Sequence, residues 1–222
     1  ADVKKFLFLG SVCIYPKYAS TPIKEESLLC GYLEPTNEAY AIAKIHGIKM
    51  LQAYNKQYGF KGVALMPCNL YGPNDEFDLK KSHFLPALIK KFHKSKKNNL
   101  VEIWGSGKAK REVMFVDDLA DAIHFFMNKI YKKDRKFLKF IKKNHFLNVG
   151  TGKDFSIKKY AQVVKNIINP KAKIKFNLKF PDGTPRKLLD IKNLNYLGWK
   201  HKTELKKGIE LTYIWAKNKK EI

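Results

Sequence analysis

The chain has 222 residues, 45% of them hydrophobic, and carries a formal net charge of +24. This length suits one large or two small domains, and the hydrophobic content excludes a disordered chain. No apolar run approaches the roughly 18 residues that a membrane-spanning helix needs, and no signal-peptide pattern opens the sequence.

The positive charge raises nucleic acid as a partner, because basic residues neutralise phosphates. The composition argues against it, since 41 of the 44 basic residues are Lys and only three are Arg. Arg is the residue that contacts phosphates and bases in a bidentate way. We therefore expect a lysine-rich surface and neither a nucleic-acid nor a membrane partner.

The three cysteines are Cys13, Cys30 and Cys68. Their number is odd and they form no Cys-x-x-Cys pair, which is typical of a protein in the reducing cytoplasm. No spacing of His and Cys indicates a metal site.

Residues 5–9 form a short, mostly apolar run that ends at Gly10 and is typical of a buried parallel strand. Ser11 and Cys13 follow at its carboxyl end, the edge at which open α/β sheets bind ligands. A hydroxyl and a thiol are well placed there for chemistry. Taken alone, Ser11 is better explained as a turn residue and Cys13 as a small buried side chain.

Residues 17–37 have the composition of a loop, and residues 38–58 that of a helix ended by Gly59, with Thr36 or Asn37 as its cap. Tyr40 and Lys44 lie four residues apart and therefore on one helical face. An ammonium group near a phenol stabilises the phenolate, so such a tyrosine can exchange a proton with a sugar oxygen. The spacing also occurs by chance on many helices.

A second buried strand is predicted at residues 63–66, followed by a loop at residues 67–73. The alternation of strands and helices predicts an α/β fold with a parallel sheet. His83 stands directly before a short helix that reaches Phe92. It is a candidate site residue or a surface residue that caps the helix.

The second half contains a predicted strand at residues 101–104 and a Gly-rich basic loop at 105–112. Backbone amides and Arg111 in this loop can hold a phosphate. Asp117 and Asp118 open a helix that extends to about Met127, where the helix dipole explains them better than catalysis does.

The lysine-dense residues 128–144 are predicted as a solvated loop or insertion. The remaining predicted elements are a strand and turn at 146–150, a helix at 156–168, a strand at 174–176, a turn-rich loop at 180–186, a short helix that ends near residue 194 and a helix from 204 to about 217.

Five ordered motifs closely resemble GDP-L-fucose synthases, which belong to the extended short-chain dehydrogenase/reductase family. The resemblance covers residues 4–215, and the motifs are Gly10–Pro16, Glu34–Lys44, Asn69–Pro73, Trp104–Glu112 and Pro181–Lys187. It implies a Rossmann-type doubly wound parallel sheet with a smaller α+β substrate domain. The Rossmann part would comprise residues 1–72 and 113–150, and the substrate domain residues 73–112 and 151–222.

The resemblance also implies an activity, the NADPH-dependent conversion of GDP-4-keto-6-deoxy-D-mannose to GDP-L-fucose by 3,5-epimerisation and 4-keto reduction. Ser11, Tyr40 and Lys44 match the reductase triad, while Cys13 and His83 match the base and acid of epimerisation. The matching cofactor-binding residues are Leu9, Gly10, Ser11, Val12, Lys44, Pro67, Cys68, Asn69, Leu70 and His83. The matching substrate-binding residues are Lys91, Trp104, Arg111 and Asp182. A cytoplasmic homodimer is implied, with the Tyr40 helix at the interface.

The chain departs from the family pattern at two places. Lys91 stands where the family has an arginine, so a diphosphate contact there is not bidentate. No Gly-x-x-Gly-x-x-Gly turn occurs, and the first strand matches a middle strand of the family's sheet. We therefore expect roughly 90–100 further residues upstream, at about 30 per strand–helix–strand unit. The chain would then be the carboxyl-terminal part of a longer enzyme that lacks much of the NADP site.

Two alternatives stay open. Another extended short-chain nucleotide-sugar epimerase or dehydratase would share Tyr40 and Lys44 but would not need Cys13 together with His83. A non-catalytic basic binding module, for example for nucleic acid, would show salt-dependent retention and no NADPH oxidation.

Overall fold

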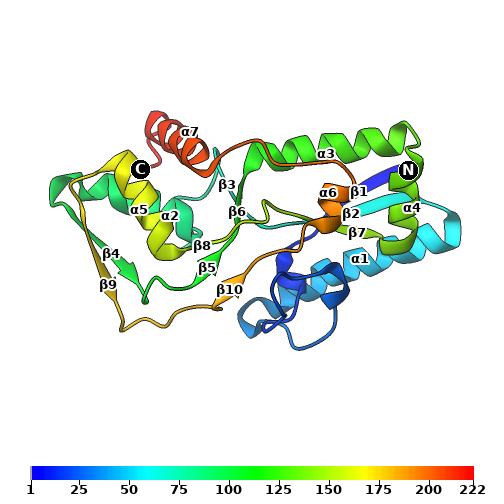
Figure 1. The fold of residues 1–222 in the computed structure, drawn as a ribbon, viewed down its shortest axis with the longest axis horizontal. Coiled ribbons are helices and arrows are strands. Elements are labelled where there is room, and N and C mark those ends of the chain that lie inside the picture. The colour runs from blue at the N-terminus through cyan, green and yellow to red at the C-terminus, as the bar shows by residue number, and fades with distance from the viewer. Residues whose placement is uncertain (1) are drawn as a thin grey trace. The chain divides into compact units, whose positions relative to one another are not determined.

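The computed structural model describes residues 2–222, which divide into two compact units (Figure 1). Unit 1 comprises residues 1–69, 117–153 and 188–201, and unit 2 comprises residues 70–116, 154–187 and 202–222. No helix among the described residues is both long and apolar enough to cross a membrane. Within the same residues, no group of three or more His, Cys, Asp or Glu is arranged to hold a metal ion.

Unit 1 is built on a parallel three-stranded sheet of β1 (Lys5–Leu9), β2 (Lys61–Pro67) and β7 (Phe146–Val149), in the order β1-β2-β7. The central strand β2 is almost entirely buried, as expected for an apolar strand with neighbours on both sides. The register pairs Leu9 of β1 with Leu65 of β2. The prediction of an α/β fold with a parallel sheet is confirmed.

Helices α1 (Glu38–Tyr58) and α3 (Val116–Tyr131) lie on opposite sides of this sheet in Figure 1. Helix α1 ends at Gly59, as predicted, and Gly59 adopts the left-handed conformation with φ +62°. Gly47 allows α1 to approach the sheet, because a Cβ there would lie 2.4 Å from the Phe8 ring.

The predicted loop at residues 128–144 is wrong, because residues 128–131 still belong to α3 and Arg135–Asn144 form a further helix, α4. Asp134 caps α4 by accepting a 2.8 Å hydrogen bond from the Phe137 backbone. The Phe137 ring is fully buried and stacks on Phe126 of α3 at 5.1 Å. The many lysines hid a helix whose narrow apolar face is made of Phe137, Phe140 and Ile141.

Residues 188–201 lie in unit 1, although the expected domain boundaries put them with the second domain. Ile23 pairs with this segment through the Leu189 bridge, and the Asn148 amide of β7 donates to the Asp190 carbonyl. The segment contains the short helix α6 (Lys192–Tyr196). Unit 1 also has the 3₁₀ turns η1 (Val12–Ile14), η2 (Glu25–Ser27) and η3 (Pro35–Asn37).

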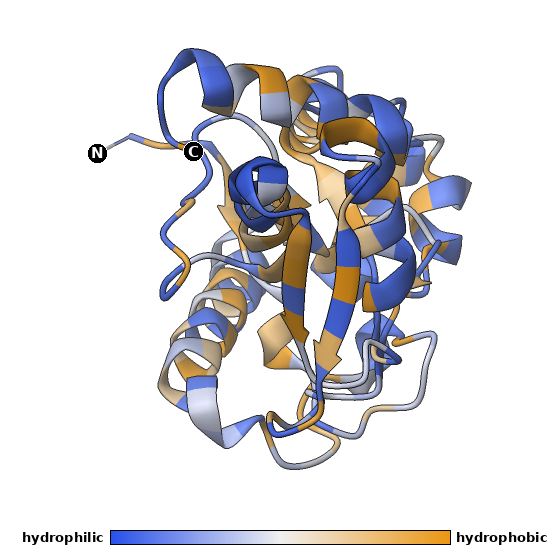
Figure 2. Ribbon diagram, turned by 90° about the vertical axis from the view of Figure 1, so that its left-hand side faces the viewer, coloured by the Kyte–Doolittle hydropathy of each residue, from blue (hydrophilic) through white to orange (hydrophobic). Residues whose placement is uncertain are grey.

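Unit 2 combines three helices, the 3₁₀ turn η4 (Ser95–Lys97) and several short strands. The helices are α2 (Phe84–Lys94), α5 (Ile157–Ile168) and α7 (Leu205–Asn218). Strand β4 (Leu100–Trp104) pairs in parallel with β9 (Lys173–Asn177), and hydropathy alternates along this pair (Figure 2).

The remaining strands of unit 2 are short. Strand β5 (Lys110–Arg111) lies between β8 (Phe155–Ser156) and β10 (Arg186–Lys187). Strand β3 (Asn69–Tyr71) pairs with β6 (Val113–Phe115). The core includes Phe77, Phe92 and Tyr160, each about 1% exposed or less.

Candidate active site

The carboxyl end of β1 carries the first group of candidate residues: Leu9, Gly10, Ser11, Val12 and Cys13. The Gly10 amide donates to the Leu65 carbonyl of β2 over 2.9 Å, which continues the sheet pairing for one residue. The Ser11 hydroxyl then caps η1 by accepting a hydrogen bond of 3.2 Å from the Cys13 amide. The strand and this cap together fix the positions of the hydroxyl and the thiol.

Tyr40 and Lys44 lie in the first turns of α1 and face the same end of β1. The Lys44 Nζ donates to the Leu9 carbonyl over 2.9 Å and lies 5.6 Å from the centroid of the Tyr40 ring. The Tyr40 side chain is 49% exposed, so its ring is open to a ligand. Unit 1 therefore brings the tyrosine and the lysine to the strand end that carries Ser11.

Asn37, which the sequence indicated only as a helix cap, contacts Cys13. Its Nδ2 donates to the Cys13 Sγ over 3.2 Å, and the thiol is partly buried. The Asn37 Oδ1 is buried without a hydrogen-bond partner among the described residues. Only the folded structure reveals this contact, because 24 residues separate the two side chains.

The four-residue segment Pro67–Leu70 continues from β2, beside the end of β1. Cys68 is 5% exposed, and its amide donates to the Val149 carbonyl of β7 over 2.9 Å. Asn69 lies in unit 1, and Leu70 is the first residue of unit 2. Pro67 and Cys68 thus lie at the carboxyl edge of the same sheet as Leu9.

The residues at this edge fit the nicotinamide end of an NADP molecule. Lys44 uses one of its three N–H donors on Leu9 and keeps two for ribose hydroxyls, while Tyr40 stays exposed beside it. Residues 2–222 provide no Gly-rich turn between a strand and a helix for the diphosphate. The fit therefore covers the reactive end of the cofactor only.

A buried polar network supports the loop after η1. The Tyr15 hydroxyl donates to the Asn148 Oδ1 over 2.5 Å, and the Asn148 backbone N–H donates to a Glu25 carboxylate oxygen over 3.1 Å. The second Glu25 oxygen accepts from Asn193. Burial raises the pKa of Glu25, and burial together with the Glu25 charge raises the pKa of Tyr15 well above its usual value. The network ties the loop that carries Cys13 to β7.

His83 occupies the N-cap position of α2 in unit 2 and is exposed. Its side chain makes no capping hydrogen bond, so the structure gives the imidazole no role in the helix. Burial raises the pKa of Asp75, while the hydrogen bond from the Glu76 amide and the nearby His83 oppose this change. The neighbouring Ser82 Oγ is buried without a partner among residues 2–222.

Trp104, at the end of β4, forms an aromatic platform in unit 2. Its ring stacks on Phe180, with centroids 4.3 Å apart and planes 14° apart, and both side chains are exposed. The Lys91 Nζ lies 5.1 Å from the Trp104 centroid and donates to the Glu102 carbonyl. Burial lowers the pKa of Lys91, and the Glu102 charge opposes this change. Sequence patterns did not reveal Phe180, because its partner lies 76 positions away in the sequence.

Asp182 and Arg111 lie on the loops that follow this platform. The Asp182 carboxylate accepts hydrogen bonds from the amide (2.9 Å) and hydroxyl (2.5 Å) of Ser106, and these bonds lower the pKa of Asp182. Arg111 donates to the Thr184 carbonyl over 2.6 Å. Burial lowers the pKa of Arg111, and the Asp182 charge opposes this change.

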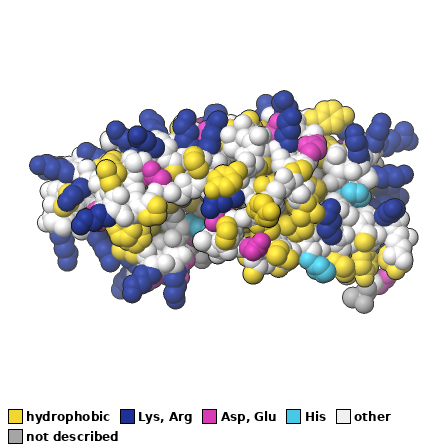
Figure 3. Space-filling model, turned by 90° about the horizontal axis from the view of Figure 1, so that it is seen from below, with side chains coloured by type: hydrophobic (Ala, Val, Ile, Leu, Met, Phe, Trp, Pro, Cys, Tyr) yellow, Lys and Arg dark blue, Asp and Glu magenta, His cyan; other side chains and the backbone are white. Residues whose placement is uncertain are grey.

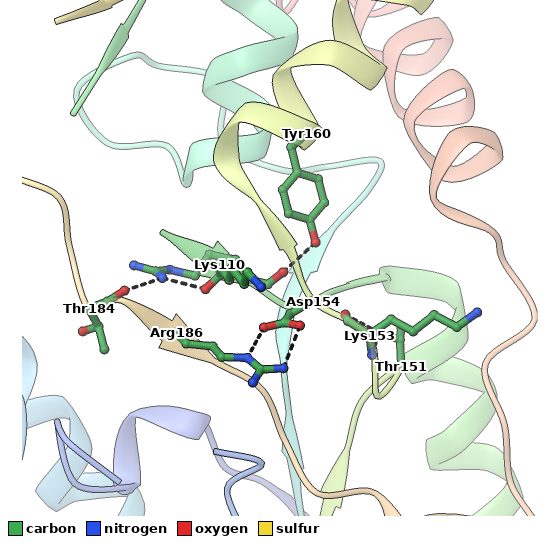
Figure 4. A network of polar contacts seen from close by, with 8 residues as sticks. Lys110, Thr151, Lys153, Asp154, Tyr160, Thr184 and Arg186 are labelled. Atoms are coloured by element: carbon green, nitrogen blue, oxygen red, sulfur yellow. Dashed lines mark hydrogen bonds and ion pairs between the residues drawn. The ribbon is translucent and has the colours of Figure 1, made fainter. Parts of the chain in front are cut away.

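The strands around Arg111 are braced by polar contacts (Figure 4). The Tyr160 hydroxyl donates to the Arg111 carbonyl over 2.7 Å. Arg186 forms a bidentate pair with Asp154, at 2.5 and 3.1 Å. The Lys91, Trp104, Arg111 and Asp182 side chains are thus held on one braced unit, whereas Ser11, Cys13, Tyr40 and Lys44 are held on the other.

Comparison with known proteins gives consistent matches. Residues 1–185 match the NAD dependent epimerase/dehydratase family. A probable GDP-L-fucose synthase of Oryza sativa subsp. japonica is 49% identical over 216 residues, which are 96% of this chain and 62% of that protein. The GDP-L-fucose synthase of Escherichia coli strain K12 is 47% identical over 219 residues, 96% of this chain and 67% of that protein.

Among solved structures, the GDP-mannoheptose C4 reductase MlghC from Campylobacter jejuni, with NADP bound, matches with a TM-score of 0.84 and 39% identity. The match covers 97% of this chain and 70% of that one. This chain therefore has the Rossmann-type fold of the family and spans about three fifths of the rice protein's length.

Proposed function

The chain belongs to the NAD dependent epimerase/dehydratase family, and we propose that it provides the catalytic residues of a GDP-L-fucose synthase. The substrate is GDP-4-keto-6-deoxy-D-mannose, which is epimerised at C-3 and C-5 and then reduced at C-4. The observation that carries the proposal is the grouping of Ser11, Cys13, Tyr40 and Lys44 at the carboxyl end of β1.

Epimerisation is assigned to Cys13 and His83. The C-4 ketone acidifies both neighbouring carbons, so one acid/base pair can serve C-3 and C-5 in turn. The Cys13 thiolate removes a proton from the carbon to give an enolate, and protonated His83 returns a proton to the opposite face. The exposed His83 imidazole, which no helix cap engages, is free for this role.

Reduction is assigned to Tyr40, Lys44 and Ser11. Bound NADPH supplies the hydride for C-4. Tyr40 gives its phenolic proton to the C-4 oxygen, and Ser11 donates a hydrogen bond to the same oxygen. The Lys44 ammonium, held at the Leu9 carbonyl, binds the nicotinamide ribose and stabilises negative charge on Tyr40. The other cofactor contacts are assigned to Leu9, Gly10, Val12, Pro67, Cys68, Asn69, Leu70 and His83.

GDP is assigned to the platform on unit 2. The exposed Trp104–Phe180 stack suits the guanine ring, since stacking is favourable for any base. Arg111 and Lys91 supply positive charge for the diphosphate, and Asp182 accepts hydrogen bonds. We assign residues 1–72 and 113–150 to the NADP-binding domain and residues 73–112 and 151–222 to the substrate domain, with residues 188–201 of the latter packed in unit 1.

The proposed assembly is a cytoplasmic homodimer. Several of the exposed large hydrophobic side chains belong to α1, and those outside the proposed active site are Ile42, Met50, Tyr54 and Tyr58. Such a helix face suits a protein partner. The basic side chains are scattered over the face seen in Figure 3 and do not gather into one patch, which disfavours nucleic acid.

The decisive experiment identifies the product formed by the wild type and by Cys13→Ser with GDP-4-keto-6-deoxy-D-mannose and NADPH. Under this proposal, the wild type forms GDP-L-fucose at saturating NADPH, where even a partial cofactor site is filled, and the variant forms none. A 4-epimerase or 4,6-dehydratase would make a different product and would tolerate the substitution. A basic binding module would leave NADPH unoxidised.

A further inference from the structure

Asn37 occupies the N-cap position of α1, where an asparagine side chain ordinarily accepts a hydrogen bond from the first helical turn. Here it makes no such bond. The amide Nδ2 instead donates to the Cys13 Sγ over 3.2 Å. A residue well suited to capping its own helix thus contacts the thiol at the end of β1.

The other end of the same amide is also unusual. The Asn37 Oδ1 is buried and lacks a hydrogen-bond partner within residues 2–222. An unpaired buried acceptor is unfavourable, and in proteins a role in catalysis is one of the recognised reasons for such a group. The amide therefore keeps an orientation that serves the thiol and leaves its carbonyl oxygen unpaired.

A hydrogen-bond donor beside the Cys13 sulfur affects both the charge of the sulfur and its position. A hydrogen bond to the charged form of a group favours that form, so an N–H aimed at sulfur stabilises the thiolate. The thiolate is the nucleophilic and basic form of cysteine. The Cys13 backbone is already fixed by the Ser11 hydroxyl, so the Asn37 contact fixes the remaining freedom of the side chain.

We propose that Asn37 is a positioning residue for Cys13, which orients the sulfur and stabilises its thiolate through the Nδ2 hydrogen bond. Its importance for proton transfer rests on the proposed function, whereas its effect on the sulfur does not. The inference therefore adds a residue that the matched motifs did not assign to the chemistry.

The test compares Asn37→Asp with the wild type. Aspartate has nearly the same shape and caps helices as well as asparagine does, so α1 keeps its N-terminus. It has no N–H to donate and places a negative charge beside the sulfur. Asn37→Ser is the second variant, because serine also caps well but is too short to replace the amide.

The readout is alkylation of the purified chain by iodoacetamide at neutral pH, followed for each cysteine by mass spectrometry. The Cys13 rate is expected to fall roughly tenfold in Asn37→Asp, the size of losing one hydrogen bond to a charged group. The exposed Cys30 is the internal control, and its rate is expected to stay constant. The ultraviolet absorbance of the thiolate, taken as the difference from Cys13→Ser, is expected to fall in parallel.

An unchanged Cys13 rate in both folded variants would overturn the proposal. Equal slowing of Cys13 and Cys30 would also contradict it, since this would reveal general loss of structure. The assay uses neither sugar nor NADPH, so its result is separate from the proposed function. Slower alkylation in a chain that forms no GDP-L-fucose would support the Asn37 contact and contradict the enzymatic assignment.

Discussion

The Lys44 ammonium lies 2.9 Å from the Leu9 carbonyl oxygen, so α1 is connected to the end of β1 at the point where Ser11 follows. This bond fixes the Lys44 side chain, whose ammonium lies 5.6 Å from the centroid of the Tyr40 ring. The Lys44–Leu9 hydrogen bond places the Tyr-x-x-x-Lys pair at the sheet edge. The spacing of the two residues in the sequence does not define this location.

Tyr40→Phe is expected to abolish reduction while epimerisation persists. The change removes the phenolic proton but keeps the ring and the Lys44–Leu9 bond. The rate of NADPH oxidation should fall about 10²–10⁴-fold, the usual contribution of a general acid. Proton exchange at C-3 and C-5 should continue near the wild-type rate. Equal loss of both activities would contradict the division of work between Tyr40 and Cys13.

Trp104→Ala and Phe180→Ala are each expected to weaken GDP binding. One aromatic stacking partner contributes about 1–3 kcal/mol to the binding of a base, and the two rings hold each other in place. Isothermal titration calorimetry with GDP measures the effect. Leu178→Ala is the matched control, because this side chain lies in the same segment and is 75% exposed. Unchanged affinity in both aromatic variants would place the base elsewhere.

Glu25 is expected to make stability depend on pH. Burial raises the pKa of its carboxyl in the folded protein, so the folded state holds this proton more tightly than the unfolded state does. The stabilisation is complete below the unfolded pKa and is lost as the pH rises through the raised folded pKa. Urea unfolding at pH 5 and pH 7.5 measures this change.

Glu25→Gln removes the titrating group, so its free energy of unfolding should vary less between these two pH values. As the pH falls, the free energy of unfolding of the wild type should rise relative to that of the variant. An identical pH dependence in both proteins would show that Glu25 contributes nothing to it.

Phe137→Ala is expected to destabilise unit 1. The ring is fully buried and stacks on Phe126, so truncation leaves a cavity that costs about 3–5 kcal/mol. The exposed Lys139→Ala on the same helix is the control and should cost little. If both variants unfold at the same urea concentration, then α4 does not pack as described.

The parallel strands and the helix that ends at Gly59 follow from apolar runs and local turn chemistry, which the sequence displays directly. Helix α4 could not be predicted in this way, because its apolar face has few residues among many lysines. The place of residues 188–201 depends on a bridge from Ile23 to Leu189, a contact between distant segments that no local pattern encodes.

The candidate site divides in the same way. Ser11, Tyr40 and Lys44 could be predicted because strand ends and helical spacing bring them to one edge. The hydrogen bond of Asn37 to Cys13 and the stacking of Phe180 on Trp104 could not, since both arise from packing between segments far apart in the chain. Asn37 also has an ordinary local role as a helix cap, which hid its contact with the thiol.

Solvent deuterium incorporation into GDP-4-keto-6-deoxy-D-mannose, measured by nuclear magnetic resonance with the purified chain in D₂O, tests the role of Cys13 without NADPH. Deuterium is expected at both C-3 and C-5 with the wild type and with Tyr40→Phe, and none above background with Cys13→Ser. Incorporation that is equal in the wild type and Cys13→Ser, or absent from both carbons in the wild type, would contradict this role.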